Sequence, residues 1–256
     1  MIKHKTPVAP RLLYLALLFV IALGGIALPV LADDPAPTPD TLVAGLSSDD
    51  PEVRAASVAG LAAMGDPAAA TALLQLLADP DPKVGLYAAQ AVGALASPEN
   101  LPVFREGMRH GNPDVRWRTA LILGELGDRR AIPTLARALS DPEVLVHRTA
   151  AESLMKLGGP AAASALVRAL DSSSASAVNA AKKGLVAMGD SAITPLIIGL
   201  AAPGAQRRAN AATILGYVGD PSALPALRTV AGIDPDEGAR AEAEWAIDQI
   251  TRKQSQ

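Results

Sequence analysis

The sequence predicts an all-α protein, a right-handed α-solenoid of about seven helix-pair repeats. Three observations predict this fold. The 256-residue chain repeats itself with a period of 31 residues, apolar ladders follow that period, and Pro- and Gly-containing corners punctuate each unit. A single helix pair cannot bury its apolar face alone, so stacked copies are expected to form a continuous core.

The apolar ladders show the period most directly, because their steps are 30 to 32 residues over seven units. The first ladder consists of Leu42, Leu73, Phe104, Leu135, Leu166, Leu196 and Leu227. The second consists of Leu61, Val92, Leu123, Leu154, Leu185, Leu215 and Ile247. The third consists of Met64, Leu95, Leu126, Leu157, Met188, Val218 and Ile250. All three are expected to be buried.

Local signals divide each unit into two helices. The first has a Pro near its start, as in residues 131–139. The second follows an Asx-Pro corner, in which the Asx side chain caps free N–H groups and Pro occupies the first turn. These corners begin at Asp50, Asp81, Asn112 and Asp141. Five second helices end at glycines that are expected to adopt the left-handed C-cap conformation, namely Gly65, Gly127, Gly158, Gly189 and Gly219.

The later units depart from this pattern. A Ser-rich segment at 171–176 and a Pro-Gly turn at 203–206 replace the Asx-Pro corner in units five and six. The last unit ends in a charged helix containing Glu242, Glu244 and Trp245. We expect that helix to shield the end of the stack from solvent.

Residues 1–32 are interpreted as a secretory signal peptide. Three basic residues precede an apolar run at 12–32, and Val30-Leu31-Ala32 is a plausible cleavage site. The alternative is an uncleaved membrane anchor, which would be the chain's only membrane contact. Either reading predicts export to the periplasm or the cell exterior. Residues 33–40 are expected to form a Pro-rich linker, 41–250 the solenoid and 251–256 a tail.

The corner Asn112-Pro113-Asp114-Val115-Arg116, followed by Ile122-Leu123-Gly124-Glu125-Leu126-Gly127-Asp128, resembles the HEAT family of repeats. It is most similar to the short bacterial type found in phycobilin lyase subunits. The resemblance covers residues 38–250. It implies a curved superhelix of helix pairs, but it does not imply one activity, because this fold carries many functions.

Composition excludes several classes of site. The chain has no cysteine, which removes disulfides, thiolate metal sites and a cysteine nucleophile. Only three histidines are present, so a multi-histidine metal centre is not expected. The formal charge is −3, which disfavours nucleic-acid binding. The His-Glu pairs that iron-binding HEAT hydroxylases use are also absent. We therefore predict no enzyme activity, no cofactor and no metal.

Two charged patterns offer candidate sites. Asp79-Pro80-Asp81 offers two carboxylates to a cation, but such corners more commonly cap helices. An arginine follows the corner valine or its equivalent at Arg54, Arg116 and Arg208, with His147 in the fourth unit. These arginines are expected to pair with a corner Asp of their own or the adjacent unit. The alternative is a row that binds phosphate or carboxylate, interrupted by Gly85, Val178 and Ala239.

An aromatic and cationic patch is the strongest functional signal. Tyr87 and Trp117 lie off the core ladders; Arg118 has the repeat position of Tyr87, and Arg148 that of Trp117. Tyr, Trp and Arg are enriched at binding hot spots, so these four residues are predicted to bind a partner. The alternative is that Trp117 packs between adjacent repeats.

The predicted function is an exported, non-enzymatic scaffold that binds a protein or peptide on the concave second-helix face. Two alternatives stay open. One is an enzyme subunit like the phycobilin lyases, which the resemblance permits. The other is a purely structural envelope protein.

Overall fold

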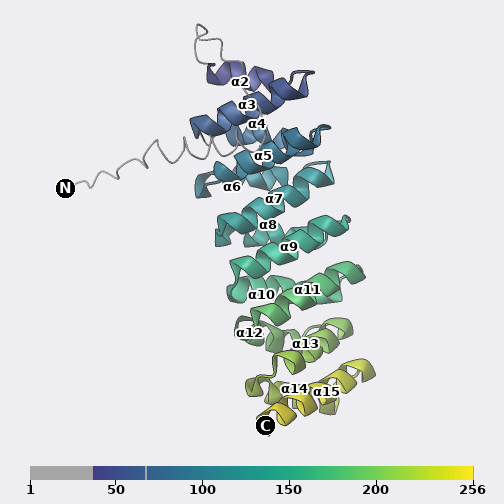
Figure 1. Ribbon diagram of the computed structural model, residues 1–256. Coiled ribbons are helices and arrows are strands. Elements are labelled where there is room, and N and C mark those ends of the chain that lie inside the picture. Colours follow the sequence, from purple (N-terminus) through teal and green to yellow (C-terminus); the bar gives the residue numbers. More distant parts are fainter. Residues whose placement is uncertain (1–36, 67, 256) are drawn as a thin grey trace, which may run out of the picture. The chain divides into compact units, whose positions relative to one another are not determined.

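The computed structural model describes residues 37–66 and 68–255. The described residues form 14 α-helices, joined by short turns and single 3-10 turns, with no β-strand among them (Figure 1). The helices fall into seven consecutive pairs, which confirms the predicted all-α repeat fold.

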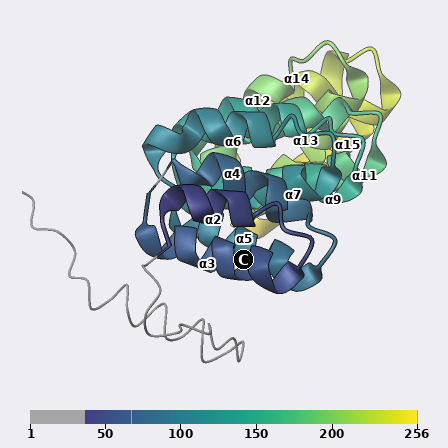
Figure 2. The ribbon, with the colours of Figure 1, turned by 90° about the horizontal axis from the view of Figure 1, so that it is seen from above.

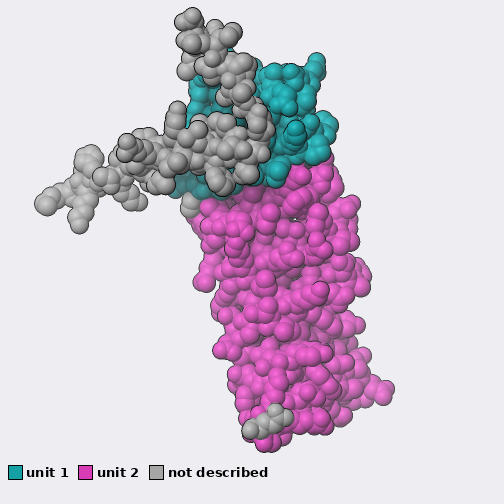
Figure 3. All heavy atoms as spheres, viewed as in Figure 1, with its two compact units in different colours: residues 1–100 teal, residues 101–256 magenta. Residues whose placement is uncertain are grey.

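The chain divides into two compact units, Met1–Asn100 and Leu101–Gln256, which Figure 3 colours separately. Unit 1 contains two helix pairs. Their bounds are Pro39–Gly45 for α2, Pro51–Met64 for α3, Ala69–Gln75 for α4 and Pro82–Ala94 for α5. In this unit α3 packs against both α2 and α5, and α5 also packs against α4.

Unit 2 contains the other five pairs. The first helices are α6 (Leu101–Gly107), α8 (Ile132–Ala138), α10 (Gly159–Arg168), α12 (Asp190–Gly199) and α14 (Leu224–Ile233). The second helices are α7 (Pro113–Leu126), α9 (Val144–Leu157), α11 (Ala175–Met188), α13 (Ala205–Val218) and α15 (Glu237–Gln254). Each second helix packs against the next, and α10 packs against both α8 and α12. Unit 2 is therefore a two-layer stack, and Figure 2 shows α6 and α12 in one layer and α7, α9 and α11 in the other.

The first apolar ladder is buried at all seven positions, from Leu42 to Leu227. The second is buried at six positions, and Ile247 on α15 is half-buried. The third ladder is a partial correction. Only Leu95, Leu157 and Ile250 are buried, and Met64 is 43% exposed. Most of its positions are the last residue of their helix, as Met64, Leu126, Leu157, Met188 and Val218 are.

The corners cap the second helices as predicted at Asp50, Asp81 and Asn112, whose side chains accept from backbone N–H groups of the first turn. Asp141 was wrongly predicted to be such a cap. In the fourth unit α9 begins at Val144, and the preceding residue is Glu143, which makes no side-chain cap. Asp141 instead accepts from the Glu143 N–H at 3.0 Å and lies two residues before the N-cap position.

All five predicted C-cap glycines have positive φ. Gly65, Gly127 and Gly219 adopt the left-handed helical conformation that was predicted. Gly158 and Gly189 differ, because ψ values of −177° and −126° turn the chain directly into the next helix. Glycine tolerates that backbone region at no steric cost, which explains why α10 and α12 begin without an intervening loop.

The signal segment 1–32 and the first part of the linker lie outside the described residues. The first described helix begins at Pro39, within the predicted linker, and the final helix continues to Gln254, so residues 251–254 of the expected tail are helical. Within the described part of the chain, no helix combines the length and apolar character needed to cross a membrane.

Candidate functional site

The arginines that follow the corner form a repeated inter-repeat contact, the arginine clamp, which consists of Arg54–Asp79, Arg116–Asp141 and Arg208–Asp234. In each, the Nε and Nη2 groups donate to the two carboxylate oxygens at 2.7 to 2.9 Å. The Nη1 group donates to two carbonyl oxygens in the corner of its own repeat. The predicted pairing is confirmed, and these arginines are occupied in holding consecutive repeats together.

The clamp lowers the pKa of the carboxylates of Asp79 and Asp234. Burial alone would raise the pKa of Asp79, but hydrogen bonds from Arg54 and from the Asp81 N–H outweigh it and bring that pKa below its usual value. Hydrogen bonding from Arg208 likewise lowers the pKa of Asp234. Both carboxylates are therefore ionised, and Asp79 serves the fold and leaves no open cation site beside Asp81. Among the described residues no group of three or more His, Cys, Asp or Glu side chains could hold a metal ion.

The interruptions in the arginine row have a structural explanation. Where the arginine is missing, the acid of the following corner is missing too. In the corners that follow Gly85, His147 and Val178, the position of the acid is occupied by His110, Ser172 and Ala202, respectively. His147 is 2% exposed, its Nδ1 lies 3.1 Å from the Asp141 carbonyl oxygen, and its buried Nε2 has no hydrogen-bond partner among the residues that the structure describes. At these three positions the arginine and the acid are absent together. In α15 the equivalent of Arg208 is Arg240, one residue beyond the predicted interruption at Ala239, and its Nη1 donates to the carbonyl oxygen of Asp234 at 2.6 Å.

Trp117 and Arg118 interact with each other on α7. The Arg118 guanidinium lies over the Trp117 ring, 5.1 Å from its centroid, in cation–π geometry. The Trp117 Nε1–H donates to Asp114 at 3.0 Å, which ties the ring to the first turn of its own helix. Both side chains are half-buried. A ring that is fixed by contacts within its own helix and is still partly exposed is the arrangement expected of a preorganised contact residue.

Arg148 lies on α9, the next second helix, and its side chain is 57% exposed. It lines a hollow of about 600 Å³ between α9 and α11, called here the α9–α11 hollow. Ala151, Ala180 and Gly184 contribute small apolar surface to its lining. Charged and polar side chains also line it, among them Glu152, Lys183 and Asn179. Small residues between two helices leave the depression open, because no long side chain fills it.

Tyr87 lies on α5 in unit 1 and is half-buried, whereas the other three predicted residues belong to unit 2. The role of Tyr87 in one patch with them stays a prediction. Within unit 2, Trp117 and Arg118 on α7 and Arg148 on α9 are carried by second helices that pack against each other. The candidate site is therefore the second-helix surface from α7 to α11.

Several residues of this surface were missed from the sequence. Asn179 has the repeat position of Trp117 and Arg148, and Lys183 has that of Glu152. Extending the comparison by one unit would have found them. A second aromatic pair, Tyr217 and Trp245, was not predicted to meet. Their rings approach edge to face at 5.1 Å where α13 packs against α15, and Tyr217 is 60% exposed.

Comparison with protein families matches the HEAT repeats at residues 39–112 and 101–186, and the PBS lyase HEAT-like repeat at 207–231. Comparison with curated proteins gives no match.

Several solved structures are similar to this chain. The karyopherin Kap121p bound to Nup53p is 15% identical. The match covers 86% of this chain and 30% of the Kap121p chain, with a TM-score of 0.56. Human deoxyhypusine hydroxylase in complex with glycerol is 22% identical over 96% of this chain and 92% of its own, with a TM-score of 0.38. The CpcE–CpcF complex of phycocyanin lyase from a Nostoc species is 21% identical over 90% and 97%, with a TM-score of 0.41. The likeness to Kap121p, which has a TM-score above 0.5 at 15% identity, concerns the fold alone.

Proposed function

Because the chain belongs to the HEAT-repeat family, we propose that it is an exported, non-enzymatic scaffold that binds a protein or peptide partner on its second-helix face. The observation that carries the proposal is the α9–α11 hollow, which lies on the same layer of helices as Trp117 and Arg118. HEAT repeats use such layers to carry extended binding surfaces.

The chemistry of the hollow suits a peptide or a protruding side chain. Its small residues permit close approach of a backbone, and Met155, which is 37% exposed, adds an adaptable apolar contact. Arg148, Glu152 and Lys183 supply charges of both signs at its border. An apolar centre with a polar border is the usual anatomy of a protein-binding surface.

The Trp117–Arg118 pair supports the same function. Tryptophan and arginine are the residue types whose truncation most strongly weakens protein–protein binding. The hydrogen bond to Asp114 and the stacked guanidinium limit the freedom of the ring before binding. Less side-chain entropy is then lost when a partner docks.

Two further points support this proposal. The clamp arginines, the alternative anion-binding row, are committed to Asp79, Asp141 and Asp234. Kap121p, which shares the fold, is bound to Nup53p in its structure.

Export rests on the basic and apolar segment at 1–32.

Site-specific photo-crosslinking in the native host tests the binding face. A photoreactive residue at position 179 or 183 of α11 should crosslink to one protein species in envelope extracts. The same group at the exposed position 194 of α12, in the other layer, should not. Equal labelling from both layers, or self-crosslinking alone, would contradict the proposal.

A matched substitution tests the aromatic pair. Trp117→Ala with Arg118→Ala should weaken capture of that species by tenfold or more, roughly the effect of losing one hot spot. The helical circular dichroism should be preserved. Unchanged capture by a folded variant would remove the pair from the binding site.

Export is tested separately by mass spectrometry of the mature N-terminus. We expect the chain to begin at Asp33 in the envelope or periplasmic fraction. A chain that begins at Met1 in the cytosolic fraction would contradict export.

A further inference from the structure

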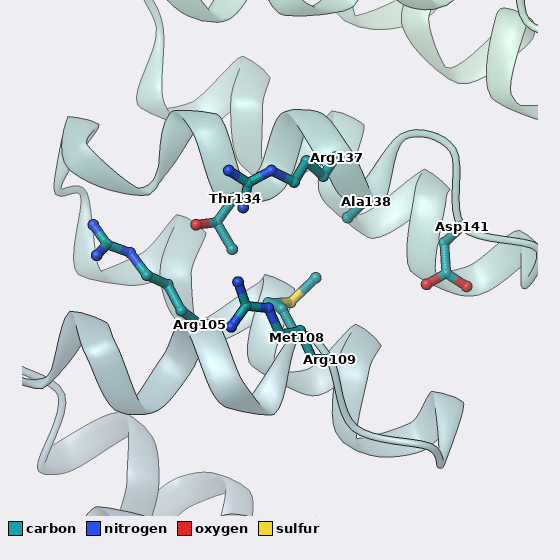
Figure 4. A pocket seen from close by; sticks show the side chains of 7 residues that line it. All are labelled: Arg105, Met108, Arg109, Thr134, Arg137, Ala138 and Asp141. Carbon is teal, nitrogen blue, oxygen red and sulfur yellow. The ribbon is translucent and has the colours of Figure 1, made fainter.

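Three arginines gather on the other layer of unit 2, away from the second-helix face. A hollow of about 120 Å³ between α6 and α8, called here the arginine hollow, is lined by Arg105 from α6, by Arg109 from the turn after α6 and by Arg137 from α8. Figure 4 shows the three guanidinium groups around the space between the two helices, with Thr134 and Met108 beside them.

Two of the three arginines of this hollow have no acidic partner among the described residues. Arg109 pairs with Glu106 at 2.8 Å. The carboxylate of Asp141, which also lines the hollow, accepts both of its ion-pair hydrogen bonds from Arg116. Within the described part of the chain, Arg105 and Arg137 have neither an ion pair nor a side-chain hydrogen bond. Two guanidinium charges therefore face one small space whose one lining carboxylate, that of Asp141, is already paired with Arg116.

The hollow also offers an uncharged donor. Thr134 is 8% exposed, and its hydroxyl has no hydrogen-bond partner among the described residues. A volume of about 120 Å³ holds one small anion with a few waters, since a water takes up roughly 30 Å³ of liquid. Guanidinium groups bind tetrahedral and planar oxyanions through paired N–H groups, and they bind phosphate especially well.

We propose that the arginine hollow binds a phosphate group. Arg105 and Arg137 contribute the charge from two consecutive repeats, and the Thr134 hydroxyl donates a hydrogen bond to an oxygen of the anion. The phosphate can be free or can be the headgroup of a phospholipid, and the chemistry of recognition is the same. This site is independent of the second-helix face, because it lies on the first helices.

The repeat supplies a matched control for a direct test. Arg168 on α10 has the repeat position of Arg137, and Arg228 on α14 has that of Arg105, yet neither lines the hollow. Arg105→Ala with Arg137→Ala removes two charges from the hollow, and Arg168→Ala with Arg228→Ala removes two charges elsewhere. Both pairs change exposed side chains, so the helical signal and the melting temperature should stay close to those of the unaltered chain.

Binding of inorganic phosphate is measured by calorimetry at low ionic strength, and binding to phosphatidylglycerol vesicles by co-sedimentation against phosphatidylcholine vesicles. The Arg105/Arg137 variant should bind at least about tenfold more weakly, as expected for loss of charged hydrogen bonds. The Arg168/Arg228 variant should bind like the unaltered chain.

Loss with vesicles alone would assign the site to a lipid headgroup, and loss with inorganic phosphate would assign it to a free anion. Equal loss in both variants, or no binding of either probe, would overturn the proposal, and neither outcome bears on partner capture by the second-helix face.

Discussion

Arg116 donates two hydrogen bonds to the carboxylate of Asp141 in the following repeat, at 2.8 and 2.9 Å. Its third group donates to the carbonyls of His110 and Gly111 in its own corner. One side chain thus joins two repeats and closes the corner that precedes its helix. The same geometry recurs at Arg54 and Arg208.

Asp141→Ala should destabilise unit 2 by roughly 1–3 kcal/mol, because it leaves the Arg116 guanidinium partly buried and unpaired. The two side chains are only 13% and 11% exposed. Urea unfolding followed by circular dichroism measures the loss. The exposed pair Lys156–Glu125 also joins consecutive repeats, so Glu125→Ala is the control and should cost less than about 1 kcal/mol. Equal losses of unfolding free energy from both substitutions would show that the clamp contributes no more than an exposed ion pair.

Acid should weaken the protein through the clamp carboxylates. The pKa values of Asp79 and Asp234 lie below the ordinary value in the folded chain, so their contribution is complete above the unfolded pKa of about 4. It is lost as the pH falls through the folded pKa, because protonation then occurs at the expense of the hydrogen bonds from arginine.

The test compares the unaltered chain with Asp234→Asn between pH 7 and pH 2. The variant should be less stable near neutral pH, and the difference in unfolding free energy should shrink as the pH drops below about 4. A difference that grows in acid would reverse the sign of the assignment.

A missing clamp should be restorable. His147 and Ser172 are 25 residues apart, like Arg116 and Asp141, and occupy the corresponding positions. His147→Arg combined with Ser172→Asp should be more stable than the sum of the single variants by about 1 kcal/mol, the usual range for residues in direct contact. Thermal or urea unfolding of the four proteins in the cycle gives this coupling energy. A coupling near zero would mean that the corner geometry differs between these repeats.

Two glycines at the same repeat position should respond to alanine in opposite directions. A Cβ on Gly124 would lie 2.5 Å from the Ser153 Oγ and 3.0 Å from the Ser153 Cα, so Gly124→Ala should push α7 from α9 and cost roughly 1–3 kcal/mol. Gly93 is also helical but has no atom within 4 Å of an added Cβ. Gly93→Ala should be neutral or stabilising by up to about 1 kcal/mol, since alanine favours the helix. Equal effects at the two sites would contradict the close approach of α7 and α9.

The sequence by itself determined the repeat and most of its helices. Period, capping and turn chemistry act over a few residues, so the caps at Asp50, Asp81 and Asn112 and the positive φ of the terminal glycines were predictable. The first ladder was predictable as well, because an apolar position that recurs in every repeat must face the core.

Only the tertiary structure decided which repeats contact each other through which side chains. Asp141 looked like a helix cap from its neighbours, yet it binds an arginine 25 residues earlier, because stacking of whole helix pairs brings the two corners together. The α9–α11 hollow and the arginine hollow each arise between helices of different repeats. Their lining residues follow from which small side chains leave space and which charges remain without a partner, and a single helix does not reveal either property.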